Sequence, residues 1–104
     1  MSRADINVYL SETRAQLDKM DRALLQLLAD RRAVVKELFE RKSQAHMPLI
    51  DPEREQALLA ERHAWGAELN LPSECIEQVM AAILNVSHAD ADVVKNLAHS
   101  IEPR

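Results

Sequence analysis

The sequence predicts an all-α fold, with three helices per chain, one of them very long, in an intertwined homodimer. Three observations lead to this prediction. The 104 residues include one glycine and four prolines, too few for the tight turns of a sheet protein. Apolar residues recur at helical spacing over long stretches. The first stretch is too long for the remaining chain to cover, which indicates a second subunit.

The first helix is expected over residues 6–45, and its apolar stripe is unusually regular. The stripe consists of Arg14, Leu17, Asp21, Leu24, Leu28, Arg31, Val35, Leu38 and Lys42. Steps of three and four residues alternate, as in the seam between two long helices. A helix of about 40 residues spans roughly 60 Å, whereas a compact domain of about 100 residues has a radius of gyration of about 13 Å. We therefore expect its uncovered part to pair with a second copy, most simply in a two-fold symmetric dimer.

Prolines separate the two later helices from the first. Asp51 is a good N-cap, followed by a proline at the first helical position, for a helix over residues 52–70. Gly66 lies inside this helix, and the sequence gives no reason for it. A third helix is expected over residues 73–99, after the linker NLPS. The three helices are expected to form a single domain over residues 1–104.

Composition limits the partners of the chain. The formal net charge is -4, whereas nucleic-acid-binding proteins typically carry a patch of excess basic residues. The longest fully apolar run, residues 79–84, is too short to cross a bilayer, and the N-terminus shows no signal-peptide pattern. We therefore expect a cytoplasmic protein that binds neither nucleic acid nor membranes. Cys75, the only cysteine, is expected to be a partly buried structural thiol.

Four charged side chains lie on the seam that should be buried, namely Arg14, Asp21, Arg31 and Lys42. One explanation is that they reach solvent or form ion pairs along the interface. The other is a buried site for a small anion. Arg31 and Lys42 are about 16 Å apart along the helix axis, so both side chains can reach a ligand between them. Arg14, about 25 Å from Arg31, can reach the site of the partner copy if the long helices run antiparallel.

Polar residues near the second and third helices extend this pattern. Asp51, Arg54 and Glu55 share one face at the start of the second helix. They form either an N-cap with a solvated ion pair or a turn that closes the pocket near Lys42. In the second case, Glu55 accepts a hydrogen bond from a ligand hydroxyl. Ser87, on the apolar stripe of the third helix, is either a tolerated small residue or a donor to a ligand carboxylate.

These residues together resemble the all-helical class of chorismate mutases, including the mutase domains fused to prephenate dehydratases and dehydrogenases. The resemblance covers roughly residues 10–95. It is carried by TRAQLDKMDRALLQLLADRR from residue 13, ERK at 40–42, PLIDPEREQALL at 48–59 and the helix around Ser87. The combination is specific, although no single stretch is.

The resemblance implies an intertwined dimer of three-helix subunits and a role for each cation of the seam. Arg14 would come from the partner subunit. Arg31 would bind a substrate carboxylate, and Lys42 would bind a carboxylate together with the ether oxygen that breaks. The cations would therefore lie in the seam because the seam holds a dianion.

The resemblance also assigns the remaining candidates. Asp51, Arg54 and Glu55 would form the end of the pocket that binds the substrate hydroxyl. Ser87 would support a carboxylate. Lys42, Arg31 and Glu55 are thus the expected catalytic residues, and the others are expected to bind substrate.

The implied reaction converts chorismate to prephenate by a pericyclic rearrangement. It requires a dianion held in a reactive conformation and positive charge where the ether oxygen becomes negative. It requires no nucleophile, metal or cofactor, so none is expected. His88, Asp90 and Asp92 lie within five residues but share no helical face, so their spacing does not predict a metal site.

One position departs from the family pattern. The family usually has Gln or Glu one helical turn after the serine, and the ungapped match puts Ala91 there. Loss of one preorganised donor can raise the barrier by about 3 kcal/mol, a factor of about one hundred in rate. The alternatives to an ordinary mutase are an enzyme acting on 4-amino-4-deoxychorismate, an isochorismate-pyruvate lyase, and a catalytically weak or dead regulatory paralogue.

Overall fold

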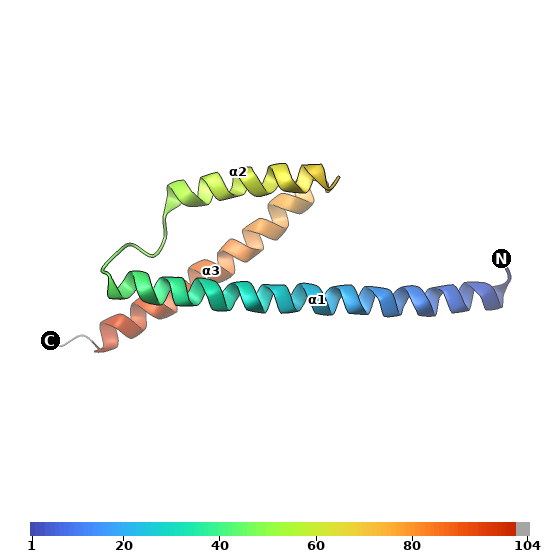
Figure 1. Ribbon diagram of the computed structural model, residues 1–104, viewed down its shortest axis with the longest axis horizontal. Coiled ribbons are helices and arrows are strands. Elements are labelled where there is room, and N and C mark those ends of the chain that lie inside the picture. Colours follow the sequence, from blue (N-terminus) through green and yellow to red (C-terminus); the bar gives the residue numbers. More distant parts are fainter. Residues whose placement is uncertain (102–104) are drawn as a thin grey trace. The chain divides into compact units, whose positions relative to one another are not determined.

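The computed structural model describes residues 1–101, with side chains through residue 98, and consists of three helices (Figure 1). α1 comprises Arg3–Gln44, α2 comprises Pro52–Glu68 and α3 comprises Ser73–Ile101. Residues 1–101 contain no strand. The predicted all-α fold with three helices, one of them very long, is confirmed, while the homodimer stays a prediction.

α1 begins before the expected residue 6 because Ser2 caps it. The Ser2 hydroxyl accepts a hydrogen bond from the Asp5 backbone N–H at 3.1 Å. The Asp5 carboxylate in turn accepts from the Ser2 backbone N–H at 3.1 Å and from its hydroxyl at 2.8 Å. This reciprocal capping box satisfies N–H groups that the first turn leaves without partners. The same hydrogen bonds from Ser2 lower the pKa of the Asp5 carboxyl below its usual value.

Left-handed backbone ends the first two helices. His46 has φ 56° and Asn70 has φ 59°. After α2, the Gly66 carbonyl accepts from the Leu71 N–H at 3.0 Å and from the Leu69 N–H at 3.1 Å, which closes the last turn. α2 therefore ends at Glu68 rather than at the expected residue 70.

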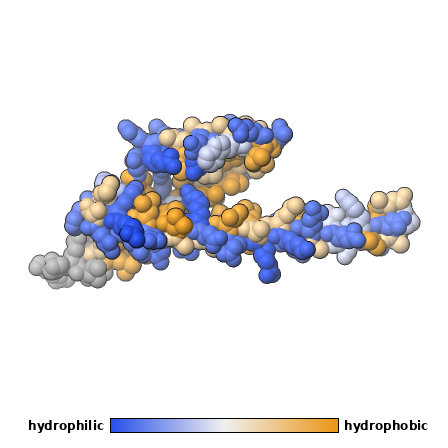
Figure 2. Space-filling view, viewed as in Figure 1, coloured by the Kyte–Doolittle hydropathy of each residue, from blue (hydrophilic) through white to orange (hydrophobic). Residues whose placement is uncertain are grey.

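Contacts within the chain define two compact units, residues 1–34 and residues 35–104. The first unit contains the greater part of α1 and no other helix. Its seam leucines are exposed, with 51% of Leu17, 56% of Leu24 and 38% of Leu28 accessible to solvent. Figure 2 shows apolar groups on the surface of this long helix. The predicted apolar stripe therefore lies on α1, and nothing else within residues 1–34 covers it.

The second unit contains a small apolar core. The core side chains come from the end of α1, the α1–α2 linker and α3, and they are Phe39, Leu49, Ala91 and Val94. Val35 and Ile50 pack against them. Because Leu49 is buried two residues before Asp51, the core fixes the linker just where α2 begins.

Gly66 lies where α2 approaches α3. A Cβ atom at Gly66 would lie 2.6 Å from Cγ1 of Ile76, far inside the contact distance. Both residues are buried. Glycine costs about 1 kcal/mol of helix propensity relative to alanine. The structure supplies a reason for that cost, since a side chain at this position would collide with Ile76.

Two further expectations concern the burial of Cys75 and the capacity of the helices to cross a membrane. Cys75 is exposed, so the prediction of a partly buried thiol was wrong. The next residue, Ile76, is the one that packs against α2, and Cys75 consequently lies off the buried face of α3. Among residues 1–101, no helix is both long enough and apolar enough to cross a membrane.

We expect Gly66→Ala to destabilise the protein by about 1–3 kcal/mol, the usual effect of overpacking. Ile76→Val removes the Cδ1 atom nearest to the new methyl group, so the double variant should recover part of the loss. Urea unfolding followed by circular dichroism measures both effects. A Gly66→Ala variant as stable as the parent, as expected for an open helix position, would contradict the close approach.

Candidate functional site

Asp51 caps α2 and fixes the direction of its first turn. Its backbone is extended, with φ -119° and ψ 101°, and its Oδ1 accepts a hydrogen bond from the Arg54 backbone N–H at 3.1 Å. Pro52 occupies the start of the helix, and Glu53 and Glu55 lie in the first turn, where the helix dipole favours negative charge. The predicted N-cap is confirmed. One oxygen of the Asp51 carboxylate is thereby committed to the helix.

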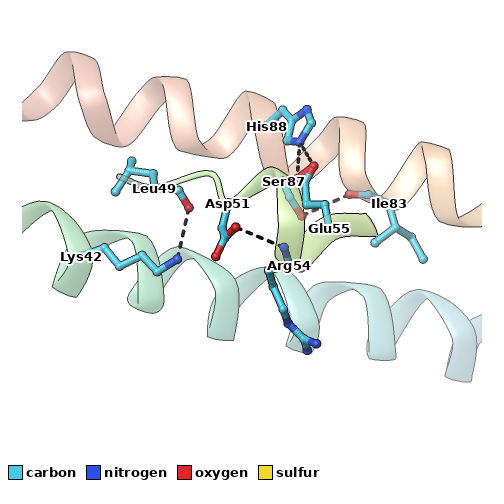
Figure 3. Close-up of polar contacts among 8 residues, drawn as sticks. All are labelled: Lys42, Leu49, Asp51, Arg54, Glu55, Ile83, Ser87 and His88. Atoms are coloured by element: carbon cyan, nitrogen blue, oxygen red, sulfur yellow. Dashed lines mark hydrogen bonds and ion pairs between the residues drawn. The ribbon is translucent and has the colours of Figure 1, made fainter. Parts of the chain in front are cut away.

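Lys42 lies beside the linker that leads to this cap. Its side chain is half-buried, and its Nζ donates to the backbone carbonyl of Leu49 at 3.4 Å (Figure 3). Leu49 belongs to the core, so the carbonyl is held in place. At this length the hydrogen bond is weak, and an anionic ligand can compete for the ammonium group at small cost. Lys42 is thus a cation that the core positions near the start of α2.

Glu55 of α2 bonds to His88 of α3. Nε2 of His88 lies 2.7 Å from each of the two carboxylate oxygens, as Figure 3 shows. The Glu55 side chain is 22% exposed and the His88 side chain 45%. The carboxylate predicted to meet a ligand hydroxyl is therefore only partly buried and is already held by one donor from the neighbouring helix.

Ser87 lies on the inward stripe of α3, as the helical period predicted, and it is buried. Its hydroxyl donates to the Ile83 carbonyl one turn earlier, at 3.2 Å. A serine hydroxyl has one proton and donates to one acceptor at a time. Donation to a ligand carboxylate would therefore require the hydroxyl to rotate away from Ile83.

The arginines occupy different parts of the chain. The side chain of Arg54 extends away from the Asp51 carboxylate in Figure 3, so the two residues interact through the backbone N–H of Arg54. Arg14 is exposed and Arg31 is half-buried, and both belong to α1 within residues 1–34. The other predicted site residues all belong to the second unit.

Ala91 forms part of the apolar core. It is 1% exposed and belongs to the same cluster as Phe39, Leu49 and Val94. Its methyl group can donate no hydrogen bond. The departure noted in the sequence is thus accommodated by apolar packing in the second unit.

His88 is the candidate that the sequence did not reveal. Its spacing relative to Asp90 and Asp92 predicts no metal site, and in the structure Asp90 is buried whereas Asp92 is exposed. Within the part of the chain that the structure describes, no three His, Cys, Asp or Glu side chains are grouped to hold a metal ion. The position of His88 next to Ser87 places it at the edge of the inward stripe. Its bond to Glu55, however, depends on how α2 packs against α3, which no local spacing encodes.

An apolar groove of about 530 Å³ runs between α2 and α3. Its lining includes Leu59, Ile76, Met80 and Leu84, with His63 and His88 among the polar members. Together with the seam of α1, it is a second apolar surface that the single chain leaves open.

Comparison with known proteins gives consistent similarities. The sequence model of the family described as chorismate mutase type II matches residues 13–92. A T-protein of Enterobacter agglomerans is 39% identical over 79 residues, which are 76% of this chain and 21% of that protein. A bifunctional chorismate mutase/prephenate dehydratase of the same organism is 34% identical over 88 residues, 83% of this chain and 23% of that protein.

A third relative is shorter. A chorismate mutase of Methanocaldococcus jannaschii is 40% identical over 47 residues, 45% of this chain and 48% of that protein. The matched part of the chain thus spans about a fifth of the T-protein and of the bifunctional enzyme, and about half of the third relative.

We expect Asp51→Ala to lower the free energy of unfolding by about 1 kcal/mol, because α2 loses its N-cap. Asp51→Ser supplies a capping hydroxyl without the carboxylate, so it should retain most of the parent stability. Urea unfolding of the three proteins measures the difference. Equal destabilisation by serine and alanine would show that the cap does not carry the effect.

Proposed function

We propose that this chain, which belongs to the chorismate mutase type II family, converts chorismate to prephenate in a pocket shared by two subunits. One observation carries the proposal. The family match over residues 13–92 includes every predicted site residue, from Arg14 to Ser87. The placement of Lys42 beside the start of α2 supports it, because this position suits a cation that meets a bound anion.

The rearrangement itself makes modest demands on the protein. One C–O bond of the substrate breaks as one C–C bond forms, and no proton or electron enters or leaves. Negative charge develops on the ether oxygen, where the ammonium group of Lys42 would stabilise it. Arg31 would bind a carboxylate of the dianion and help to hold the reactive conformation.

The start of α2 would bind the other end of the substrate. Glu55 would accept a hydrogen bond from the substrate hydroxyl, and Asp51 and Arg54 would close this end of the pocket. Ser87 would rotate to support a carboxylate. The first turn of α2 is suited to this role because its cap and the core fix the backbone before any ligand arrives.

The pocket would be completed in a homodimer. Leu17, Leu24 and Leu28 are exposed along the seam of α1, and the groove between α2 and α3 is also open. Burial of both surfaces against a second copy would remove apolar area from water, at about 25 cal/mol per Å². In that dimer, Arg14 would enter the pocket of the partner.

The buried methyl group of Ala91 favours a second candidate function, catalysis on a related substrate. With Ala91 in the apolar core, the ether oxygen would meet Lys42 without a second donor from α3. An enzyme so altered would turn over chorismate slowly or would prefer 4-amino-4-deoxychorismate or isochorismate. Product identification with each of the three compounds separates these cases.

We expect Lys42→Ala to lower kcat for chorismate at least about a hundredfold, because it removes charge stabilisation of the transition state. Lys36→Ala, which alters an exposed lysine of the same helix, is the matched control and should keep parent activity. Sedimentation should show the same oligomer for both variants. Normal turnover by the Lys42→Ala variant would overturn the assignment of this lysine.

We expect Arg14→Ala and Arg31→Ala each to be nearly inactive and to recover activity when the two proteins are mixed. In a heterodimer, one pocket loses both arginines and the other regains both. Random exchange makes half of the dimers heterodimers, so about a quarter of the parent activity per site should return. Native mass spectrometry verifies that heterodimers form, and no recovery despite their presence would exclude the shared pocket.

A further inference from the structure

We propose that His88 is a positioning residue, which holds the Glu55 carboxylate as an acceptor for the substrate hydroxyl and thereby sets specificity at that end of the pocket. The inference rests on the proposed function, since Glu55 is given its ligand there. The observation behind it is independent of that function, because it is a bond between two helices of the free chain.

The geometry defines which atom donates. Nε2 of His88 lies 2.7 Å from both Oε1 and Oε2 of Glu55. A carboxylate only accepts hydrogen bonds, so Nε2 carries the proton and its N–H is shared between the two oxygens. A shared donor lies near the bisector of the carboxylate, which fixes both the position and the plane of the group.

Fixing this plane has a consequence for ligand binding. A glutamate side chain has several rotatable bonds, and freezing them on binding costs free energy. His88 restrains them beforehand, so the cost is met in the free protein. Each carboxylate oxygen keeps lone-pair capacity beyond the one used by His88. The restrained group therefore presents acceptors only, in a defined direction.

An acceptor-only group selects its ligand by chemistry. It favours a substrate that carries a hydroxyl or an amine at this position, and it disfavours one that carries an ether or no polar group there. Sites built to hydrogen-bond a substrate hydroxyl reject analogues lacking it far more strongly than apolar pockets reject a missing methylene group. His88 would sharpen this discrimination by preventing Glu55 from turning aside.

A purely structural role is the competing explanation. His88 and Glu55 are 45% and 22% exposed, and pairs in such positions add little to stability. Replacement of His88 should therefore change catalysis more than it changes stability. His63 offers a matched comparison, because its Nε2 bonds Ser73 Oγ at 2.8 Å and likewise links α2 with α3. His63 lies eight residues beyond Glu55, about 12 Å along the helix.

The test compares His88→Leu, which removes the donor, with His88→Gln, whose side-chain NH₂ lies the same number of bonds from the backbone. We expect the leucine variant to lose about tenfold in kcat/KM with chorismate, the effect of one hydrogen bond to a charged group. The loss should fall mainly on KM, since the hydroxyl is bound in both ground state and transition state. The glutamine variant should recover most of it, and His63→Leu should keep parent kinetics.

One further result connects the effect to Glu55. In a Glu55→Ala background, His88→Leu should cause no further loss, because no acceptor remains to be positioned. Equal losses in the leucine and glutamine variants, or an undiminished loss in the Glu55→Ala background, would overturn the proposal.

A measurement without substrate separates this proposal from the proposed function. In ¹⁵N NMR of histidine-labelled protein, Nε2 of His88 should give the signal of a protonated, hydrogen-bonded nitrogen, and Glu55→Ala, which removes the acceptor, should shift it. Absence of that shift would overturn the His88 proposal even in an active mutase. Its presence in a protein that turns over none of the three substrates would leave the pair intact and reject the proposed reaction.

Discussion

The apolar seam of α1 has no cover within residues 1–34, and the proposed site depends on how it becomes covered. A long helix gains most of its stability from packing of its apolar face rather than from intrinsic propensity. Burial of the exposed part of each seam leucine, about half of the side chain, would contribute about 1 kcal/mol. Arg14 and Arg31 lie in the same seam, so a second helix that buries these leucines would also remove water from the two arginines. Removing a cation from water is costly, and a bound dianion would offset that cost. In a dimer, one stretch of sequence would therefore link subunit association to anion binding.

In the second unit, a small core fixes the backbone beside the candidate site. Phe39, Leu49, Ala91 and Val94 are buried together, and Leu49 brings the linker against α3. The Leu49 carbonyl accepts a hydrogen bond from Lys42, and Asp51, two residues later, caps α2. Burial of Leu49 thus helps to fix the backbone near one cation, Lys42, and one anion, Asp51. Ala91 belongs to this arrangement as packing, so the core accommodates a methyl group where the resemblance implies Gln or Glu.

Local signals in the sequence predicted the local features of the structure. Asp51 was identified as an N-cap from its place before a proline, and the 3–4 alternation identified the long helix. The features that depend on helix packing were not predictable. The need for Gly66 arises from Ile76, ten residues away on another helix, and the bond between His88 and Glu55 joins residues 33 apart. Cys75 was misplaced for the same reason, because the sequence does not state which face of α3 meets α2. The roles of all the predicted site residues stay predictions, and that of Arg14 depends in addition on a second subunit.

The most direct measurement is to incubate the purified protein with chorismate, follow its loss and identify the product by chromatography, with isochorismate and 4-amino-4-deoxychorismate in parallel. We predict that prephenate forms from chorismate without added metal or cofactor, at a rate that Lys42 sustains despite Ala91. Turnover of only one of the other two compounds would reassign the substrate while keeping the site. No turnover of any of the three by a folded dimer would contradict the proposed mutase activity and leave a binding protein on a mutase scaffold.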